Sequence, residues 1–432
     1  MDFTRTRRVP HIGYVIWLED LGYHVISTQV LSVLKEAQAA LKNDGRIYII
    51  AFQNIRSYVK WNFVKTGLKA DLRSRGIDLV ICPIVTFPNK DNFYAPWSIL
   101  VFWLMPQALF LLFFVCLIRR LKILHCRAYI GTLPAIVIKK IAGAKVIFDP
   151  RSPFIEEGVL SEKFKKGSIT YKFWKSMEKR IWKKSDVSIL ITRSYLELFQ
   201  NLSSHKTSYA LIPNNVDSER FRPDPELRLS VRRKLGFQPE EIVFCYSGSL
   251  GKLWNNPCVY AHFIKMLRSS PLRYRFLFLT THVSALMAAF KDNGIVPAEY
   301  VALSASLNEV PGYLAASDFG LNLMAHPDIR LGIKSVEYLS MGLPLIITAN
   351  VLGACEIVEK YNVGYIIRDL NQVNFPEFIQ FVRNRKEYSM RSRKTALEIF
   401  STAIVGKKYS ELYRSLQTND QPHMPEAVLE TI

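Results

Sequence analysis

LGIKSVEYLSMGLPLIIT, residues Leu331–Thr348, is the stretch from which the rest of the chain is best interpreted. Its first part predicts a short helix, because Ser335–Leu339 are all tolerated inside helices. Gly342 predicts the helix end, since glycine enters the left-handed conformation without penalty. Pro344 cannot continue a helix, and the apolar run after it has the length of a buried strand.

Two charged residues fall at functionally suggestive places in this helix. Lys334 lies at or just before its start, and Glu337 lies about one turn inside. A helix N-terminus attracts phosphate, and a lysine there adds a full positive charge. A carboxylate nearby can accept hydrogen bonds from a sugar diol. The spacing therefore suits a nucleotide diphosphate, although an ordinary helix–strand unit with a surface lysine gives the same pattern.

The overall composition predicts a two-domain protein that attracts polyanions. The chain has 432 residues, 49% of them hydrophobic, a net charge of +20 and a pI near 9.6. Zinc-finger spacing, RNA-binding aromatic motifs and a long basic tail are missing from the sequence, so we expect an anionic membrane surface and no nucleic acid. The cysteines lie without close pairing and predict reduced core residues of a cytosolic protein: Cys82, Cys116, Cys126, Cys245, Cys258 and Cys355. The polar, basic N-terminus predicts no secretory signal.

The first half alternates predicted strands with helical segments. Apolar runs predict the strands His11–Leu18, Ile47–Phe52, Ile77–Ile84, Ile123–Tyr129, Ala144–Asp149 and Val187–Thr192, the last being the final strand of this half. Ser27–Leu41 has helical spacing between the first two strands. Such alternation predicts a doubly wound α/β layer, in which ligands bind at the carboxyl ends of strands.

Two basic segments carry aromatic residues at helical spacing. They are Ile55–Arg75 and Lys163–Lys184. A basic amphipathic helix with aromatic residues is typical of a membrane-surface element. A solvated helix with one face in the core is the alternative.

Trp97–Ile118 carries no charge over 22 residues and is long enough to cross a bilayer. A crossing would separate Ile123–Tyr129 from the earlier strands of the same sheet, so we expect a monotopic or hairpin-like membrane element. A helix buried between domains or in an oligomer interface is the alternative. Pro106, in the middle of the segment, predicts a kink.

The segment G-I-K-S-V-E-Y-L-S-M-G-L-P-L-I resembles the donor-binding segment of glycosyltransferase family 4, which often has P-T-K-x-x-E-Y-L-A-x-G-x-P-V-I there. A second similarity lies in Leu211–Pro223, where P-N-N-V-D-x-x-x-F-x-P matches the family's usual P-N-G-V-D-x-x-x-F-x-P. The likeness extends more weakly from about Asp149 to the end of the chain. It implies the GT-B fold: two Rossmann-like domains that face each other across a cleft, with a C-terminal helix that crosses back to the first domain.

The resemblance implies donor-binding residues in the second half. Lys334 and Glu337 are the implied catalytic contacts with the donor, and the glycine-rich turn Ser247–Lys252 lets backbone N–H groups approach phosphate. The family's arginine in that turn is replaced here by Ser249, and its first acidic residue would fall at Ile329, beside Asp328. The full implied donor set is Ser247, Gly248, Ser249, Gly251, Lys252, His282, Leu307, Ile333 and Ser335.

The resemblance also implies two further catalytic residues, His125 and Asp149, and residues on the acceptor side, which are Arg127, Arg151, Gly22 and Tyr23. His125 corresponds to a histidine near the transfer site, but Arg127 replaces the second histidine of the family's H-x-H. Asp149 and Arg151 belong to a segment similar to the family's F-D-x-R-x-x-x-x-E, and a buried Asp–Arg pair that fixes a loop is the alternative. The turn with Gly22 and Tyr23 is the equivalent of one that faces the acceptor.

The sequence thus predicts an N-terminal acceptor domain over residues 1–205, with membrane-associating helices, and a nucleotide-sugar domain over 206–394. A crossover helix over 395–416 and a flexible tail over 417–432 follow. The expected activity is retaining transfer of a sugar from a UDP- or GDP-linked donor to a lipid-linked saccharide, with a polyprenyl diphosphate as the carrier in bacterial cell-surface polysaccharide assembly. We expect no metal and no other cofactor, because no D-x-D motif is present. The expected location is peripheral or monotopic, on the cytoplasmic face of the inner membrane.

Two other functions fit the same residues. A sugar-nucleotide epimerase or a phosphorylase of this fold would use the same phosphate site but need no lipid-facing surface. A non-catalytic scaffold of a membrane-bound synthesis complex would also explain the replaced arginine and acidic residue.

Overall fold

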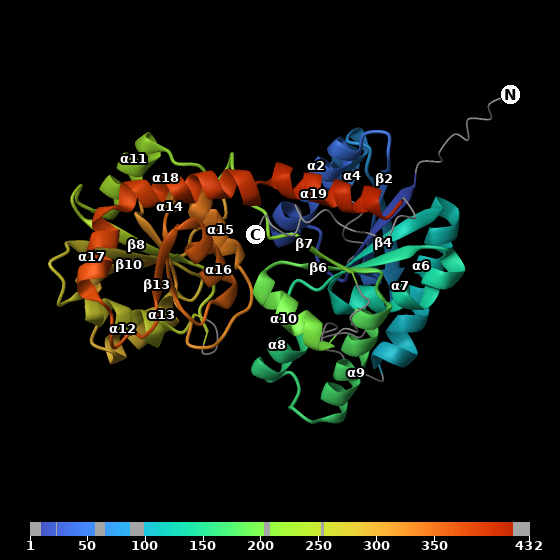
Figure 1. Cartoon of the computed structure of the whole chain (residues 1–432), viewed down its shortest axis with the longest axis horizontal. Coiled ribbons are helices and arrows are strands. Elements are labelled where there is room, and N and C mark those ends of the chain that lie inside the picture. The colour runs from blue at the N-terminus through green and yellow to red at the C-terminus, as the bar shows by residue number, and fades with distance from the viewer. Residues whose placement is uncertain are drawn as a thin grey trace. The chain divides into compact units, whose positions relative to one another are not determined.

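A computed structural model describes residues 10–22, 24–56, 65–86, 99–202, 208–251 and 255–417. The chain divides into two compact units. Unit 1 comprises the described residues of Met1–Ile191, Leu196–Ile212 and Thr402–Thr431, and unit 2 comprises those of Thr192–Tyr195 and Pro213–Ser401. Each unit is described by itself below (Figure 1).

Unit 1 is built on a seven-stranded parallel sheet with the order β3-β2-β1-β4-β5-β6-β7. The order reverses direction between β1 and β4, as in doubly wound sheets. The strands are β1 (His11–Trp17), β2 (Arg46–Asn54), β3 (Asp78–Ile84), β4 (Leu121–Arg127), β5 (Lys145–Asp149), β6 (Val187–Leu190) and β7 (Ser208–Leu211). The predicted doubly wound layer is confirmed.

The helices of unit 1 cover both faces of this sheet. One face packs against α2 and α19, whose buried side chains join those of β1 and β2 in one core cluster. The other face is covered by α6 and α7. The helical segments are α1 (His24–Ile26), η1 (Ser27–Leu31), α2 (Ser32–Leu41), α4 (Lys65–Ser74), η2 (Leu100–Leu104), α6 (Met105–Arg119), α7 (Ala128–Ala142), α8 (Phe154–Leu160), α9 (Ile169–Lys184), α10 (Arg193–Leu202, which starts at the unit boundary) and α19 (Thr402–Ser415).

Unit 2 is built on a six-stranded parallel sheet with the order β10-β9-β8-β11-β12-β13. Phenylalanines of its strands and of α12 and α17 form much of its core cluster. The strands are β8 (Ile242–Ser247), β9 (Tyr274–Leu279), β10 (Tyr300–Leu303), β11 (Phe319–Asn322), β12 (Leu345–Thr348) and β13 (Gly364–Ile367). The helical segments are α11 (Pro225–Leu235), α12 (Pro257–Leu267), α13 (Val283–Asp292), η3 (Pro297–Glu299), α14 (Val310–Ala315), α15 (Ile333–Ser340), α16 (Leu352–Tyr361), α17 (Phe375–Arg383), α18 (Arg385–Thr395) and η4 (Ala396–Phe400).

The helix and strand predicted within Leu331–Thr348 are α15 and β12. Gly342 has a φ of +71°, so it supplies the left-handed turn between them. The side chain of Tyr338 lies against Gly320 on β11, where an added Cβ would come within 2.3 Å of the tyrosine ring. Glycine in that strand therefore lets α15 pack close to the sheet.

Two strand predictions in unit 1 are confirmed as strands but were wrong in one detail each. Val187–Thr192 does not contain the last strand of the sheet, because β7 follows and pairs in parallel with β6. The predicted strand Ile123–Tyr129 ends two residues early, since Ala128 has a φ of +60° and begins α7. Four-residue strands such as β7 carry too little periodicity to be recognised from sequence.

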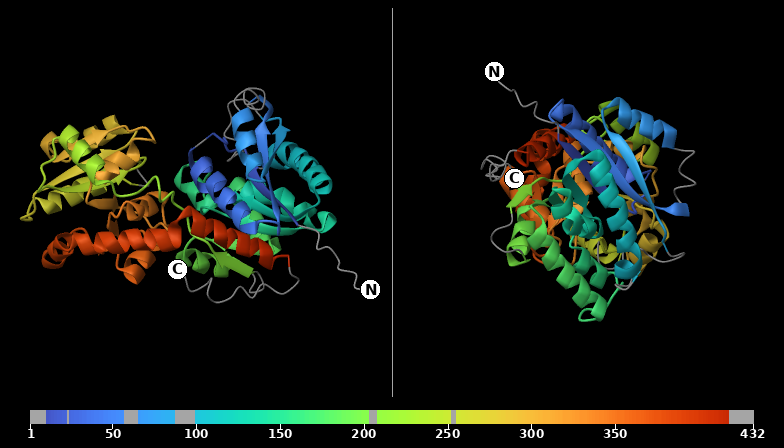
Figure 2. Two further views of the ribbon diagram at one scale, coloured as in Figure 1. Left: turned by 90° about the horizontal axis from the view of Figure 1, so that it is seen from above. Right: turned by 90° about the vertical axis from the view of Figure 1, so that its right-hand side faces the viewer.

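The helix α19 follows unit 2 in the sequence but belongs to unit 1. It packs along α2, as both views of Figure 2 show. Gly406 makes the close approach possible, because a Cβ there would lie 2.4 Å from the Cβ of Glu36. Val405, Tyr409 and Leu412 complete the core on that face of the sheet.

Candidate active site

The loop after β8 and the start of α15 come together in unit 2. An added Cβ at Gly248 would lie 3.9 Å from Cε of Lys334 and 2.9 Å from the hydroxyl of Tyr246. Gly248 also has a φ of +156°, which favours glycine. The N–H of Ser247 donates to the hydroxyl of Tyr338, at 2.7 Å. The predicted phosphate loop therefore adjoins the predicted phosphate-binding lysine.

Lys334 and Glu337 form a half-exposed pair at this point. The ammonium lies 3.3 Å from Oε2 of Glu337, and the lysine side chain is 40% exposed. Glu337 is buried, and its burial raises the pKa of the carboxyl although Lys334 opposes that shift. The helix begins at Ile333 without a side-chain cap. The first turn of α15 therefore presents positive charge to an anion that arrives from solvent, and the carboxylate of Glu337 lies next to that charge.

The other predicted donor residues differ in their contacts and in their exposure to solvent. Leu250 donates its N–H to Nδ1 of His282 at 3.4 Å, so His282 adjoins the loop. The hydroxyl of Ser335 is buried and accepts from Asn322, at 3.2 Å. The rest are exposed or half-buried, namely Ser249, Gly251, Leu307 and Ile333. Lys252 lies outside the described residues.

Arg220 is a residue of this region that the sequence reasoning missed. Its guanidinium donates to the carbonyl of Leu307 and lies over the ring of Phe221, at 5.3 Å. Burial raises the pKa of the Glu337 carboxyl, and the positive charge of Arg220 opposes that shift as Lys334 does. Arg220 occupies one of the unspecified positions of P-N-N-V-D-x-x-x-F-x-P, so the motif gave no reason to select it.

Asp328, the carboxylate next to Ile329, is engaged within its own loop. Its carboxylate is buried and accepts from Nε and Nη2 of Arg330, at 2.8 and 3.1 Å. The pair fixes the loop before α15.

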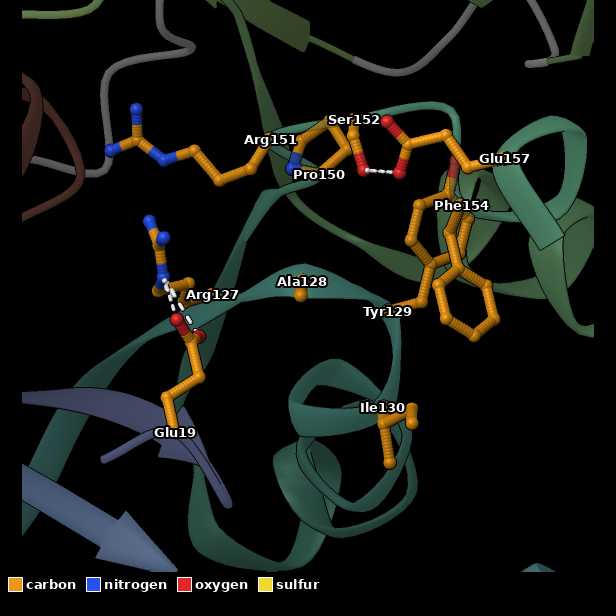
Figure 3. Close-up of a pocket in the computed structure, with 10 residues that line it drawn as sticks. All are labelled: Glu19, Arg127, Ala128, Tyr129, Ile130, Pro150, Arg151, Ser152, Phe154 and Glu157. Atoms are coloured by element: carbon orange, nitrogen blue, oxygen red, sulfur yellow. Dashed lines mark hydrogen bonds and ion pairs between the residues drawn. The ribbon is translucent and has the colours of Figure 1, made fainter. Parts of the chain in front are cut away.

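A cavity of about 230 Å³ opens in unit 1 at the carboxyl ends of β4 and β5 (Figure 3). Three residues that line it follow or end strands: Glu19, Arg127 and Arg151. The remaining lining residues are Ala128, Tyr129, Ile130, Pro150, Ser152, Phe154 and Glu157. Paired charges, hydroxyls and two aromatic rings suit a polyhydroxylated ligand.

Arg127 is held in one orientation by Glu19. Its Nε donates to both carboxylate oxygens, at 2.8 and 3.1 Å. Figure 3 shows the terminal nitrogens directed away from that carboxylate. Nη1 is buried and has no hydrogen-bond partner in the described structure. A buried donor without a partner is costly, so this nitrogen is ready to bind an oxygen of a ligand.

The backbone around the cavity is strained at three strand ends. Leu18, Ala128 and Arg151 have φ values of +50°, +60° and +59°. Such conformations cost about 1–3 kcal/mol each in residues other than glycine and gather at functional sites. These backbone conformations direct the neighbouring side chains of Glu19 and Arg127 into the cavity.

Behind the cavity lies a buried polar cluster that includes His125 and Asp149. Asp149 pairs with Arg151, at 2.9 Å, and lies 3.4 Å from Nε2 of His125. Tyr409 and Tyr413 reach it from α19: Tyr409 accepts from Arg151 at 2.7 Å, and Tyr413 shares a hydrogen bond of 2.7 Å with Nδ1 of His125. The C-terminal helix therefore holds the side chains on which the cavity rests.

Protonation in this cluster follows from burial and charge. Burial lowers the pKa of His125, so the ring is neutral near pH 7. Burial alone would raise the pKa of Asp149, but Arg151 and His125 lower it below its usual value. Burial, with Asp149 nearby, raises the pKa of Tyr14 to about 12. The charge balance is therefore that of a structural Asp–Arg pair beside a neutral histidine.

The structure separates the predicted catalytic and acceptor-side residues of unit 1. Arg127 and Arg151 line the cavity. His125 and Asp149 are fully buried behind it and do not line it. Gly22 is exposed in a turn, where its N–H donates to Asp20 at 2.9 Å, and it does not line the cavity either. Tyr23 lies outside the described residues.

Comparison with known proteins gave structural neighbours alone. No family model and no curated protein matches the sequence. HepE of Anabaena, solved with UDP and glucose, superposes with a TM-score of 0.64 at 14% identity, over 94% of this chain and all of that one. A glycosyltransferase of Rickettsia africae gives 0.66 at 15% identity, over 95% of this chain and all of that one. WaaG gives 0.57 at 15% identity, over 93% and 99%.

The fold is GT-B. The match extends over nearly the whole of each chain, and this chain has two parallel sheets covered by helices. Identities this low establish the architecture and leave the chemistry to be argued from the residues.

Proposed function

We propose that this chain is a retaining glycosyltransferase that uses a nucleotide diphosphate sugar as donor. The observation that carries the proposal is the approach of Lys334 to the Gly248 turn at the start of α15. In such a transfer the bond between the anomeric carbon and the donor phosphate breaks, and negative charge grows on the leaving diphosphate. A lysine and a helix N-terminus meet that charge where it develops.

Glu337 and Arg220 complete the proposed donor site. The buried carboxylate of Glu337 is placed to accept hydrogen bonds from hydroxyls of the donor. Arg220, which contacts Leu307, adds a second positive charge within the electrostatic reach of Glu337. UDP is the more strongly supported nucleotide, because HepE was solved with UDP and glucose; GDP is the alternative.

The cavity of unit 1 is the proposed acceptor site. Arg127 and Glu19 offer a donor and acceptor pair to the hydroxyls of a saccharide, and Tyr129 and Phe154 offer aromatic faces. The acceptor hydroxyl forms the new glycosidic bond, and its proton passes to the leaving phosphate oxygen. We propose that no divalent metal or other cofactor is required, since cationic groups and backbone amides are arranged to meet the diphosphate.

We propose a lipid-linked saccharide, carried on a polyprenyl diphosphate, as the acceptor. The supporting observations are the net charge of +20 and the apolar helix that precedes β4. WaaG, a structural neighbour, is described as a glycosyltransferase involved in lipopolysaccharide biosynthesis, which fits cell-surface polysaccharide assembly. The corresponding location is the cytoplasmic face of the inner membrane, with peripheral or monotopic attachment.

The test is transfer from a panel of radiolabelled UDP- and GDP-sugars in the presence of bacterial membrane lipid extract. We expect label from one donor to enter the organic phase with the purified protein. Interconversion of free sugar nucleotides without transfer would indicate an epimerase. Failure to bind any nucleotide sugar, measured by titration calorimetry, would indicate a scaffold and end the proposal.

A further inference from the structure

The helix formed by η2 and α6 is apolar on the side away from the sheet. Its buried side is a stripe with a spacing of four, which packs on unit 1: Leu100, Leu104, Ala108, Leu112 and Cys116. A helix that covers a sheet usually turns polar side chains to water. Here the outward side chains are Phe102, Trp103, Phe110, Phe114, Leu117 and Ile118, each between 44% and 72% exposed.

The apolar surface continues onto α7. The two helices pack against each other, and Figure 1 shows them side by side. Val137 and Ile141 of α7 are 60% and 74% exposed. We call this surface, made of the six outward residues of η2–α6 and these two, the α6–α7 face. Large apolar side chains that gather in exposed positions on two packed helices indicate a binding surface.

Cations gather at one end of the α6–α7 face. In the sequence α6 precedes β4 and α7 follows it, and both helices run antiparallel to the strand. Both helices therefore end beside the amino ends of the strands. Lys122 confirms the meeting of these ends, because its Nζ lies 3.6 Å from the position of a Cβ at Gly143, the C-cap of α7. The exposed cations of this end are Arg119, Arg120, Lys122 and Lys140.

The helix α9 adds more cations at the same end. It packs against α7, and Lys139 of α7 donates to the last carbonyl of α9, that of Lys184, at 2.7 Å. The exposed cations of its last turns are Lys179, Arg180, Lys183 and Lys184. Asp186 lies among them and is paired with Lys139 at 2.9 Å. The end of the face is thus strongly positive.

A bilayer crossing does not fit this arrangement. The helix Leu100–Arg119 is long enough and apolar enough to cross a bilayer, and most of it is not buried. However, it connects β3 to β4, and both strands belong to the same sheet. A span would put the two strands on opposite sides of the membrane. Because the buried stripe of the helix packs on the sheet, the α6–α7 face can instead lie flat on a membrane surface.

We propose that the α6–α7 face docks onto an anionic phospholipid bilayer, with its apolar side chains below the headgroups and the cationic end bound to acidic lipids. Charge complementarity favours a membrane over a second protein, because lysine is depleted at protein interfaces and favoured beside anionic lipid. This inference deepens the proposed membrane location and rests on it, but does not depend on the proposed sugar transfer.

The docked orientation also places the cavity near lipid. Ile130 in the first turn of α7 lines the cavity, and Ile141 belongs to the α6–α7 face. At 1.5 Å per residue the two lie about 16 Å apart along one helix. A saccharide anchored in the bilayer by a lipid diphosphate can bridge that distance.

The test is co-sedimentation of the full chain with vesicles, without any nucleotide sugar. We expect binding to vesicles of equal parts phosphatidylglycerol and phosphatidylcholine, and at least tenfold weaker binding to phosphatidylcholine alone. The double substitution Phe110→Ser with Ile118→Ser should reduce binding at least tenfold. Lys140→Glu with Lys183→Glu should reduce binding to the anionic vesicles and weaken its salt dependence.

The matched control is Leu229→Ser with Met390→Ser in unit 2, since these side chains are also apolar and 57% and 68% exposed. It should bind as the unchanged chain does, and circular dichroism melts should confirm that all variants fold. Equal binding by Phe110→Ser with Ile118→Ser and by the unchanged chain would overturn the proposal. The proposal would also be overturned if the unchanged chain bound neither kind of vesicle but formed a concentration-dependent dimer, and if this variant abolished the dimer. Loss of sugar transfer with intact vesicle binding would count against the proposed reaction alone.

Discussion

Lys334 is the single side chain on which the donor proposal depends most. Lys334→Ala should lower kcat by about 10²–10³-fold, the effect of removing one charge-stabilising donor from a transition state. Nucleotide binding should weaken less, since the charge on the diphosphate grows as the bond breaks. Steady-state assays with the donor found in the panel measure both. The control is Lys265→Ala, an exposed lysine of α12, which should leave kcat unchanged. Near-normal turnover of Lys334→Ala would contradict the phosphate assignment.

His125, which the family resemblance implies to be catalytic, is fully buried and is therefore also a source of pH-dependent stability. Its pKa is lowered from 6.5 by burial, so the unfolded chain binds a proton at a pH where the folded chain does not. Stability from this site is therefore complete above pH 6.5 and declines as the pH falls below it. His125→Asn removes that decline.

We expect the melting temperature of the unchanged chain to fall more steeply between pH 7 and 5 than that of His125→Asn. Calorimetric scans across that range measure the difference. Parallel pH profiles for the two proteins would show that His125 titrates alike in the folded and unfolded states.

At the scale of elements, α19 supplies two tyrosines with separable roles. Tyr409→Phe removes the hydroxyl bound to Arg151, a lining residue of the cavity, whereas Tyr413→Phe removes the hydroxyl bound to His125 behind it. Both should cost about 1–3 kcal/mol of unfolding free energy, because each leaves a buried polar group without its partner.

The kinetic effects of the pair should differ. Tyr409→Phe should raise KM for the acceptor several-fold with little change in KM for the donor, because Arg151 loses its support. Tyr413→Phe serves as the matched control and should leave both KM values unchanged. Denaturant melts and two-substrate kinetics test the pair, and equal KM effects would argue against a positioning role for Tyr409.

At the scale of the whole molecule, unit 1 depends on a helix that comes after unit 2 in the sequence. A chain that ends at Ser401 lacks the core residues Val405, Tyr409 and Leu412, so unit 1 should lose its cooperative unfolding transition. The fragment Pro213–Ser401 contains the core cluster of unit 2 and should unfold cooperatively by itself. Near- and far-ultraviolet circular dichroism melts of the two fragments test this. A cooperative unit 1 in the truncated chain would show that α19 is dispensable for its fold.

Local patterns by themselves determined the α/β class, the α15–β12 pair and the left-handed turn at Gly342, because period, glycine and proline act within a few residues. They also placed Lys334 and Glu337 on one helix, since residues three apart share a helix face.

Only the tertiary structure decided which candidate residues meet a cavity and which support it. His125 and Asp149 are buried because tyrosines about 260–290 positions later in the chain close over them, and no local pattern carries that information. Arg220 contacts Leu307, and β7 pairs with β6, through contacts of the same long-range kind. The sequence encodes such contacts only through the packing of the whole unit, because the burial of each side chain and the choice of its partner depend on all the elements that pack around it.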